Sequence, residues 1–189
     1  MLNNNSEIAA AVAAVTGGVG RAVASAESAN ATGVYRVECR DAAGNLKWAD
    51  DIKNVVTTAG KNDALDKYLA GSAYTAAWYL GLISATSYVS VPVAADTSAS
   101  HATWTEDQGY SQATRPAASF SAAAAGSKAL ASAGVFSMNA NTTIKGCFLI
   151  SVNTKGGTTG VLYSAGLFTG GDKVMQSGDT LNVSYTASL

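Results

Sequence analysis

Short strand-like segments separated by turn signals occupy residues 118–189, and they restrict the fold more than any other feature of the sequence. The last segment alternates Leu181, Val183 and Tyr185 with polar residues, which is typical of a strand with one buried face. Turn sequences such as NTKGGTTG and QSGD lie between the segments. This spacing predicts a mainly β chain folded as an antiparallel β-sandwich, either jelly-roll-like or immunoglobulin-like. Strands are expected near residues 118–124, 128–138, 142–152, 160–168 and 179–187.

The part of the chain before residue 85 adds further strands. The run GVYRVECRDAAGNLKWADDIKNVVTT predicts two strands joined by a turn at Asp41–Asn45. A third short apolar strand is expected at Trp78–Ile83.

One short helix is expected between these strands, in TTAGKNDALDKYLAGSA. Leu65 and Leu69 recur one helical turn apart, and Gly71 is placed to end the helix. Either Thr58 or Asn62 is suited to cap its first turn.

The first 32 residues differ in composition from the rest and predict an extended N-terminal arm. Alanine favours helix at residues 6–15, and Gly17, Gly18 and Gly20 then interrupt it. The polar start and Glu7 do not match a signal peptide. Side chains this small bury little surface, so we expect the arm to lie against its own domain or a neighbouring subunit. The predicted organisation is an arm at residues 1–32 and a β-sandwich body at 33–189.

The composition argues against several classes of partner. Charged residues make up only 13% of the chain, against about a quarter in typical soluble domains. The net charge of −1 gives no basic surface for nucleic acid, and no apolar run is long enough for a membrane span. A surface with so few charges favours burial against other copies, so a homo-oligomer is expected.

The two cysteines, Cys39 and Cys147, both lie in apolar strand-like runs and lack the spacing of a metal site. Buried free thiols are the favoured interpretation. A disulfide stays open as the alternative, because it requires only that their strands be neighbours.

A polar loop within residues 78–116 gathers the scarce charged and aromatic side chains. We expect Asp96 to cap the backbone N–H groups of Ser98 and Ala99, with His101 and Trp104 folded back on that turn. The loop is predicted to be structural, and its candidate residues are Asp96, His101, Trp104, Tyr110 and Arg115.

The same loop offers little chemistry. His101 is the single histidine, and no GxSxG elbow surrounds a serine. Asp96, His101 and Glu106 match no established metal-ligand spacing. Glu106 and Asp107 are adjacent, so on a strand they point to opposite faces and cannot act together as a glycosidase pair. We therefore predict no catalytic, cofactor-binding or metal-binding residue and no cofactor.

Four segments of the sequence carry a family resemblance: WYLGLI, AADTSASHATWTEDQGYSQATRP, KGCFLISVNTKGGTTGVLYSAGLF and SGDTLNVSYTASL. In this order they resemble a group of small virion-associated proteins of tailed bacteriophages, over residues 33–189. The resemblance implies a non-enzymatic structural protein located in the virion and assembled in the cytoplasm of the host bacterium.

Three functions are compatible with these observations. The first is a capsid decoration (cement) protein, with the major capsid protein and neighbouring copies of itself as partners. The second is a tail, collar or fibre-attachment protein. The third is a carbohydrate-binding module, for which Trp78, Tyr79, Trp104 and Tyr110 could supply a stacking platform.

Overall fold

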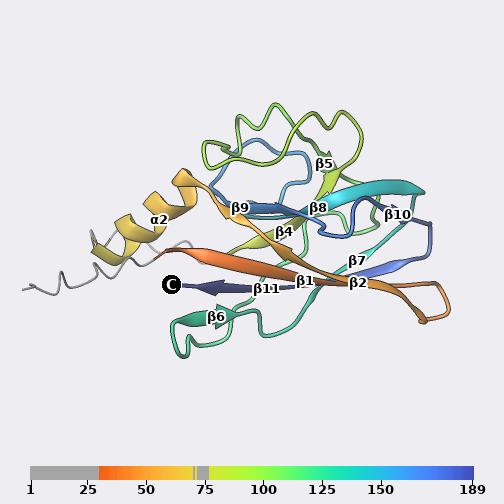
Figure 1. The fold of residues 1–189 in the computed structure, drawn as a ribbon, viewed down its shortest axis with the longest axis horizontal. Coiled ribbons are helices and arrows are strands. Elements are labelled where there is room, and N and C mark those ends of the chain that lie inside the picture. Colours follow the sequence, from red (N-terminus) through yellow and green to blue (C-terminus); the bar gives the residue numbers. More distant parts are fainter. Residues whose placement is uncertain (1–29, 70, 72–76) are drawn as a thin grey trace, which may run out of the picture.

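The computed structural model describes residues 30–69, 71 and 77–189, and these form two antiparallel β-sheets packed face to face (Figure 1). The first sheet has the strand order β2-β1-β11-β6, with β7 also paired to β11. Its strands are β1 (Thr32–Arg40), β2 (Leu46–Lys53), β6 (Ser127–Ala129), β7 (Gly134–Ser137) and β11 (Thr180–Ser188). The long pair β1 and β11 is in register from Thr32 opposite Ser188 to Arg40 opposite Thr180.

The second sheet has the order β3-β9-β8-β4-β5, with β10 also paired to β8. Its strands are β3 (Val55–Val56), β4 (Tyr79–Ser84), β5 (Glu106–Asp107), β8 (Thr142–Ile150), β9 (Leu162–Leu167) and β10 (Lys173–Met175). The predicted antiparallel β-sandwich is therefore confirmed.

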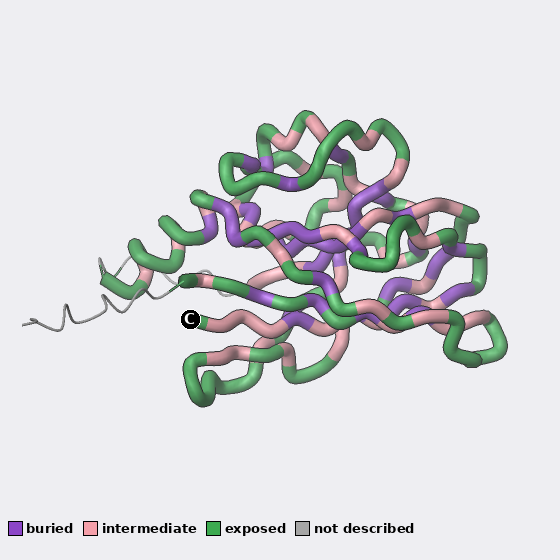
Figure 2. The backbone as a smooth tube through the Cα atoms, viewed as in Figure 1, coloured by how far each residue is buried: buried purple, intermediate pink, exposed green. Residues whose placement is uncertain are grey.

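The main core lies between the two sheets. The first sheet contributes inward side chains from alternate positions of β1 and β11, such as Val37 and Val183, and the second contributes Leu82, Cys147 and Leu149. Figure 2 shows the buried positions concentrated in the strands, while most connecting loops are exposed. Both cysteines are buried and free, so the favoured interpretation of two thiols is confirmed.

A second apolar cluster lies on the outer face of the second sheet. Ile83, Phe148 and Ile150 point away from the main core and pack with Trp104, which comes from the long loop after β4. Gly81 makes room for this packing, because a Cβ at that position would overlap the ring of Phe148. The loop therefore forms a third layer, seen above β4, β8 and β9 in Figure 1.

Helix α2 (Thr58–Leu69) is the one helix within the described residues, and it begins one residue after its cap. The hydroxyl of Thr57 accepts a hydrogen bond from the N–H of Gly60 at 3.0 Å, so Thr57 is the cap rather than the predicted Thr58 or Asn62. Gly71 has φ +65°, the left-handed conformation expected of a residue that ends a helix.

The packing of α2 differs from the simplest expectation for an amphipathic helix. Leu65 and Leu69 are 54% and 73% exposed, whereas Gly60 is the buried residue. A Cβ at Gly60 would lie 2.6 Å from the carbonyl oxygen of Tyr163, so the absent side chain allows the helix to approach β9.

Two strand predictions fail in detail. Residues 118–124 form isolated bridges, such as Phe120 with Leu130, instead of a strand. The expected strand at 128–138 is divided into β6 and β7, which pair with successive parts of β11. The predicted N-terminal arm falls almost entirely outside the described residues, and β1 begins at Thr32.

Candidate functional site

The charged residues of the loop are joined by a buried ion pair. Arg115 donates from Nε to Glu106 Oε1 at 2.9 Å and from Nη2 to Glu106 Oε2 at 2.8 Å. The two side chains are 2% and 5% exposed. Arg115 Nη1 also donates to the carbonyl of Val152 at 2.8 Å, and Glu106 Oε2 accepts from the N–H of Gly156 at 2.5 Å. The pair therefore fastens the loop to the turn between β8 and β9.

Trp104 is the apolar anchor of the loop. Its side chain is 1% exposed, and its ring centroid lies 5.4 Å from that of Phe148 on β8. The indole N–H donates to Asp96 Oδ2 at 2.9 Å, and the same oxygen accepts from the N–H of Val93 at 3.0 Å. Asp96 thus links two parts of the loop through the buried indole.

The predicted role of Asp96 is wrong in detail. Its carboxylate bonds to Val93 and Trp104 rather than to the N–H groups of Ser98 and Ala99. The expected turn is present, but Thr97 closes it: the N–H of Ser100 donates to both the carbonyl and the hydroxyl of Thr97. The carboxylate points inward because the indole N–H would otherwise be buried without an acceptor.

His101 lies against Trp104, a contact that the sequence did not predict. The two rings stack with centroids 4.1 Å apart and planes 22° apart. Nδ1 lies 2.9 Å from the carbonyl oxygen of Trp104, and because a carbonyl can only accept, this nitrogen carries the proton. The histidine is thus held by the backbone of the loop.

The possible partners of His101 are engaged elsewhere. Ser98 Oγ donates to the carbonyl of Thr159 at 2.7 Å, and Asp96 binds the indole. A cavity of about 250 Å³ is lined by His101, Glu106 and Arg115, together with Trp104 and apolar side chains of β8 and β9. Its carboxylate and guanidinium already satisfy each other, and no serine–histidine–aspartate relay links these groups.

Tyr110 completes the buried part of the loop. Its ring is 1% exposed and meets Phe136 edge-on at 4.9 Å, and its hydroxyl donates to Glu106 at 3.4 Å. Burial, together with the neighbouring carboxylate of Glu106, raises its pKa. Lys155 Nζ lies 3.8 Å from the ring centroid and donates to the backbone carbonyl of Tyr110.

The adjacent carboxylates of β5 serve separate bonds. Asp107 accepts from the N–H of Gly109 at 2.9 Å and from the hydroxyl of Thr142, while Glu106 binds Arg115. Within the described part of the chain, no group of three histidine, cysteine or acidic residues is arranged to hold a metal ion. No helix in that part is long and apolar enough to cross a membrane.

Three exposed valines lie at alternate positions in the loop after β4. Val89, Val91 and Val93 are 75%, 58% and 47% exposed, and we call them the valine face. Their segment is tied down where the N–H of Val89 donates to the carbonyl of Thr103 at 2.8 Å. The loop therefore presents these side chains from a bonded support.

The four aromatic residues considered as a stacking platform for a carbohydrate do not lie on one surface. Trp104 and Tyr110 are buried, so their faces cannot stack on a sugar. Trp78 packs against the core between the sheets and Tyr79 against the outer cluster, on opposite sides of the second sheet.

A second cavity was not predicted from the sequence. It has a volume of about 390 Å³, and we call it the aromatic cavity. Its walls include Trp78, Phe120, Leu149, Tyr163 and Tyr185. These residues come from five separate segments, so no local motif indicates that they meet.

Comparison with known proteins gives no significant match, either to a protein-family model or to a curated protein sequence.

Proposed function

We propose that this chain is a non-enzymatic structural protein of a bacteriophage particle, a decoration (cement) protein that lies on the head lattice and braces the joints between capsomers. The observation that best supports the proposal is how the polar residues of the loop are used. Arg115, Glu106, Asp96 and His101 bond to one another, to the indole of Trp104 or to backbone, and these bonds hold the loop in place as an outer layer. This is the arrangement of a scaffold rather than of a catalytic centre, and it agrees with the resemblance to virion proteins.

The valine face is the proposed contact with the major capsid protein. Three exposed valines lie within five residues of each other, on a segment that is hydrogen-bonded to the rest of the loop at Val89. A segment that is already held in place loses little conformational entropy when it binds a partner. The exposed leucines of α2, Leu65 and Leu69, are the proposed contact with neighbouring copies. Assembly would bury both groups of exposed apolar side chains, and their removal from water would favour binding.

The test of this contact is a pair of matched variants. Val91→Asp places a charge in the valine face, and Val174→Asp places the same charge on β10, where Val174 is 66% exposed. Binding is measured by co-sedimentation with phage heads assembled without the chain. We expect Val91→Asp to weaken binding at least about tenfold and Val174→Asp to bind as the unchanged chain does.

Both variants should unfold at the temperature of the unchanged chain, because both positions are exposed. If Val91→Asp decorates heads as tightly as Val174→Asp, the valine face is not the contact. If the unchanged chain does not bind heads at all, the proposed function is wrong.

A further inference from the structure

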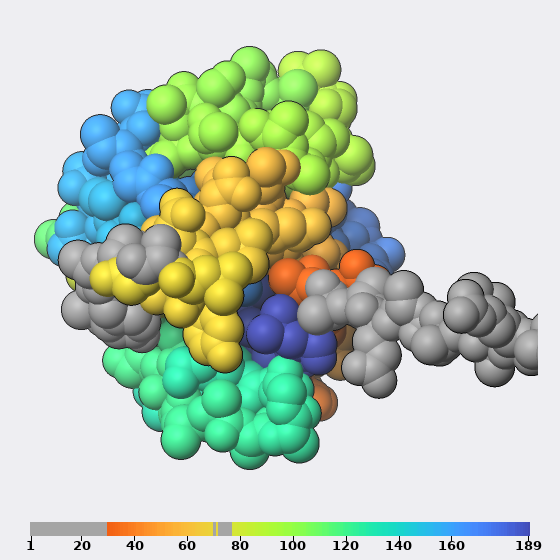
Figure 3. All heavy atoms as spheres, turned by 90° about the vertical axis from the view of Figure 1, so that its left-hand side faces the viewer, coloured from red at the N-terminus to blue at the C-terminus, as the bar shows by residue number. Residues whose placement is uncertain are grey.

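The aromatic cavity opens at one end of the sandwich, beside helix α2. Figure 3 looks onto this end: the helix, in yellow, lies between the long loop above, in light green, and the segment around residue 125 below. The helix lines one side with Asp63 and Lys67, and β11 lines the other with Tyr185. The volume of about 390 Å³ lies within the range of small-molecule sites.

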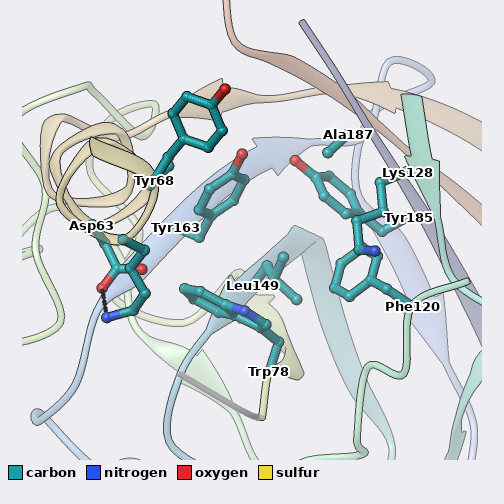
Figure 4. Close-up of a pocket in the computed structure, with 11 residues that line it drawn as sticks. Asp63, Tyr68, Trp78, Phe120, Lys128, Leu149, Tyr163, Tyr185 and Ala187 are labelled. Atoms are coloured by element: carbon teal, nitrogen blue, oxygen red, sulfur yellow. Dashed lines mark ion pairs between the residues drawn. The ribbon is translucent and has the colours of Figure 1, made fainter. Parts of the chain in front are cut away.

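The walls are a series of rings that meet edge to face. Trp78 and Tyr163 have centroids 5.5 Å apart at 68°, Tyr163 and Tyr185 are 6.5 Å apart at 83°, and Phe120 and Tyr185 are 6.3 Å apart at 82°. Figure 4 shows Trp78 and Tyr163 on one side, Phe120 and Tyr185 on the other, and Leu149 between them. Walls that offer both ring faces and ring edges suit a flat aromatic guest, whose own face and edge can each find a partner.

The tyrosine hydroxyls keep the walls neutral. Burial raises the pKa of both Tyr163 and Tyr185, so neither phenol ionises near neutral pH. The hydroxyl of Tyr185 lies 3.4 Å from Ser164 Oγ and from Asn54 Nδ2. The walls therefore contribute no negative charge.

The rim carries one positive charge in excess. Lys67 and Asp63 neutralise each other as an ion pair at 3.2 Å. Lys128, on the opposite rim, donates to the neutral carbonyl of Ser121 at 2.9 Å, and none of the ion pairs among the described residues involves it. Its ammonium has three N–H donors, and the hydrogen bond to this carbonyl leaves the others for a ligand.

We propose that the aromatic cavity binds a small planar aromatic molecule of one or two rings that carries one negative charge. The rings of the ligand enter between Trp78 and Tyr163 on one side and Phe120 and Tyr185 on the other, and its anionic group meets Lys128. The residues that line this site do not include the valine face.

The test uses 2-naphthoate and its neutral analogue 2-naphthylmethanol, titrated into the full chain by calorimetry. We expect one site per chain and tighter binding of the anion. Lys128→Gln should weaken 2-naphthoate about fivefold and leave the neutral analogue unchanged, because the lost interaction is a partly exposed charge pair. Trp78→Leu should weaken both ligands at least about tenfold, because an aromatic wall is lost.

Lys61→Gln is the matched control, since Lys61 lies on the same helix as the cavity rim, is exposed and does not line the cavity. It removes the same net charge and should leave both affinities unchanged. The proposal is overturned if 2-naphthoate shows no saturable binding at millimolar concentration, as it would if a segment of this chain or of a partner filled the cavity. It is also overturned if Trp78→Leu binds normally, or if Lys61→Gln weakens 2-naphthoate as much as Lys128→Gln.

Discussion

Arg115 and Glu106 face each other inside the protein and share two parallel hydrogen bonds of 2.9 and 2.8 Å. Two opposite charges sealed from water add little net stability, because each loses its hydration on folding. Removal of one charge is different, since the other is then buried without a partner. The stability of the folded loop therefore requires both Arg115 and Glu106.

Replacement of Glu106 by Ala should therefore lower the free energy of unfolding by about 3–5 kcal/mol, because the guanidinium of Arg115 stays buried. Urea denaturation measures the change. The control is Asp51→Ala, whose partner Arg36 is 3.9 Å away and whose pair is largely exposed, with an expected change below about 1 kcal/mol. Equal effects of the two substitutions would contradict the role given to the buried pair.

Trp104→Ala should cost about 3–5 kcal/mol of stability, because it empties the centre of the outer cluster. Trp104→Phe should cost less, since it keeps most of the packing and loses the hydrogen bond to Asp96. Thermal and urea unfolding of both variants give the order. An alanine variant as stable as the phenylalanine variant would show that the ring is not an anchor.

His101→Ala should leave binding to phage heads unchanged, because the histidine bonds to the backbone of its own loop. Co-sedimentation with heads and thermal unfolding are measured together. A loss of head binding at unchanged thermal stability would assign His101 a direct contact and contradict the structural role.

The chain should lose stability in alkaline solution. Burial, followed by the nearby carboxylate of Asp179, raises the pKa of Cys39 from its ordinary value of 9.0 to about 11. Above pH 9 the folded chain keeps a proton that the unfolded chain releases, so the free energy of unfolding falls as pH rises. The stabilisation that comes from the protonated thiol of Cys39 is fully present below pH 9. It decreases as the pH rises from 9 to 11, by about 1.4 kcal/mol per pH unit.

Urea denaturation with a reductant, over this pH range, measures the slope. Cys39→Ala should unfold with a shallower slope than the unchanged chain, although burial also raises the pKa of Cys147 and Tyr185 and keeps some slope. Identical slopes would show that Cys39 ionises equally in both states.

Deletion of residues 1–29 should leave the sandwich folded, because β1 begins at Thr32 and the described core begins at Tyr35. We expect the shortened chain to unfold near the temperature of the full chain and to bind heads more weakly, as predicted for an arm that contacts a neighbour. A shortened chain that decorates heads as tightly as the full chain would contradict this role.

The sequence predicts elements whose pattern depends on local geometry. The alternation of Leu181, Val183 and Tyr185 with polar residues predicts β11, and Gly71 predicts the end of α2. Strands β4 and β8 lie where strands are expected, but the burial of their outer face needs tertiary information, because the loop that covers this face is polar in sequence. Residues 118–124 are mostly apolar in sequence, which predicts a strand, but in the structure they make only isolated bridges.

The site residues divide in the same way. Trp104 and His101 are close in sequence, so both could be expected beside the same turn, whereas the stacking of their rings follows only from the structure. Glu106 and Arg115 are nine positions apart on an irregular path, and no periodicity indicates that they pair. The aromatic cavity is assembled from both sheets and α2, and its existence follows only from the way these elements pack.

The copy number of the chain in purified phage particles tests the central claim most directly. Quantitative mass spectrometry against the major capsid protein measures it. A decoration protein on the head lattice should be present in copies on the order of hundreds, following the symmetry of the lattice. About a dozen copies or fewer, as expected at a collar, tail or fibre, or absence from the particle, would contradict the assignment to the head.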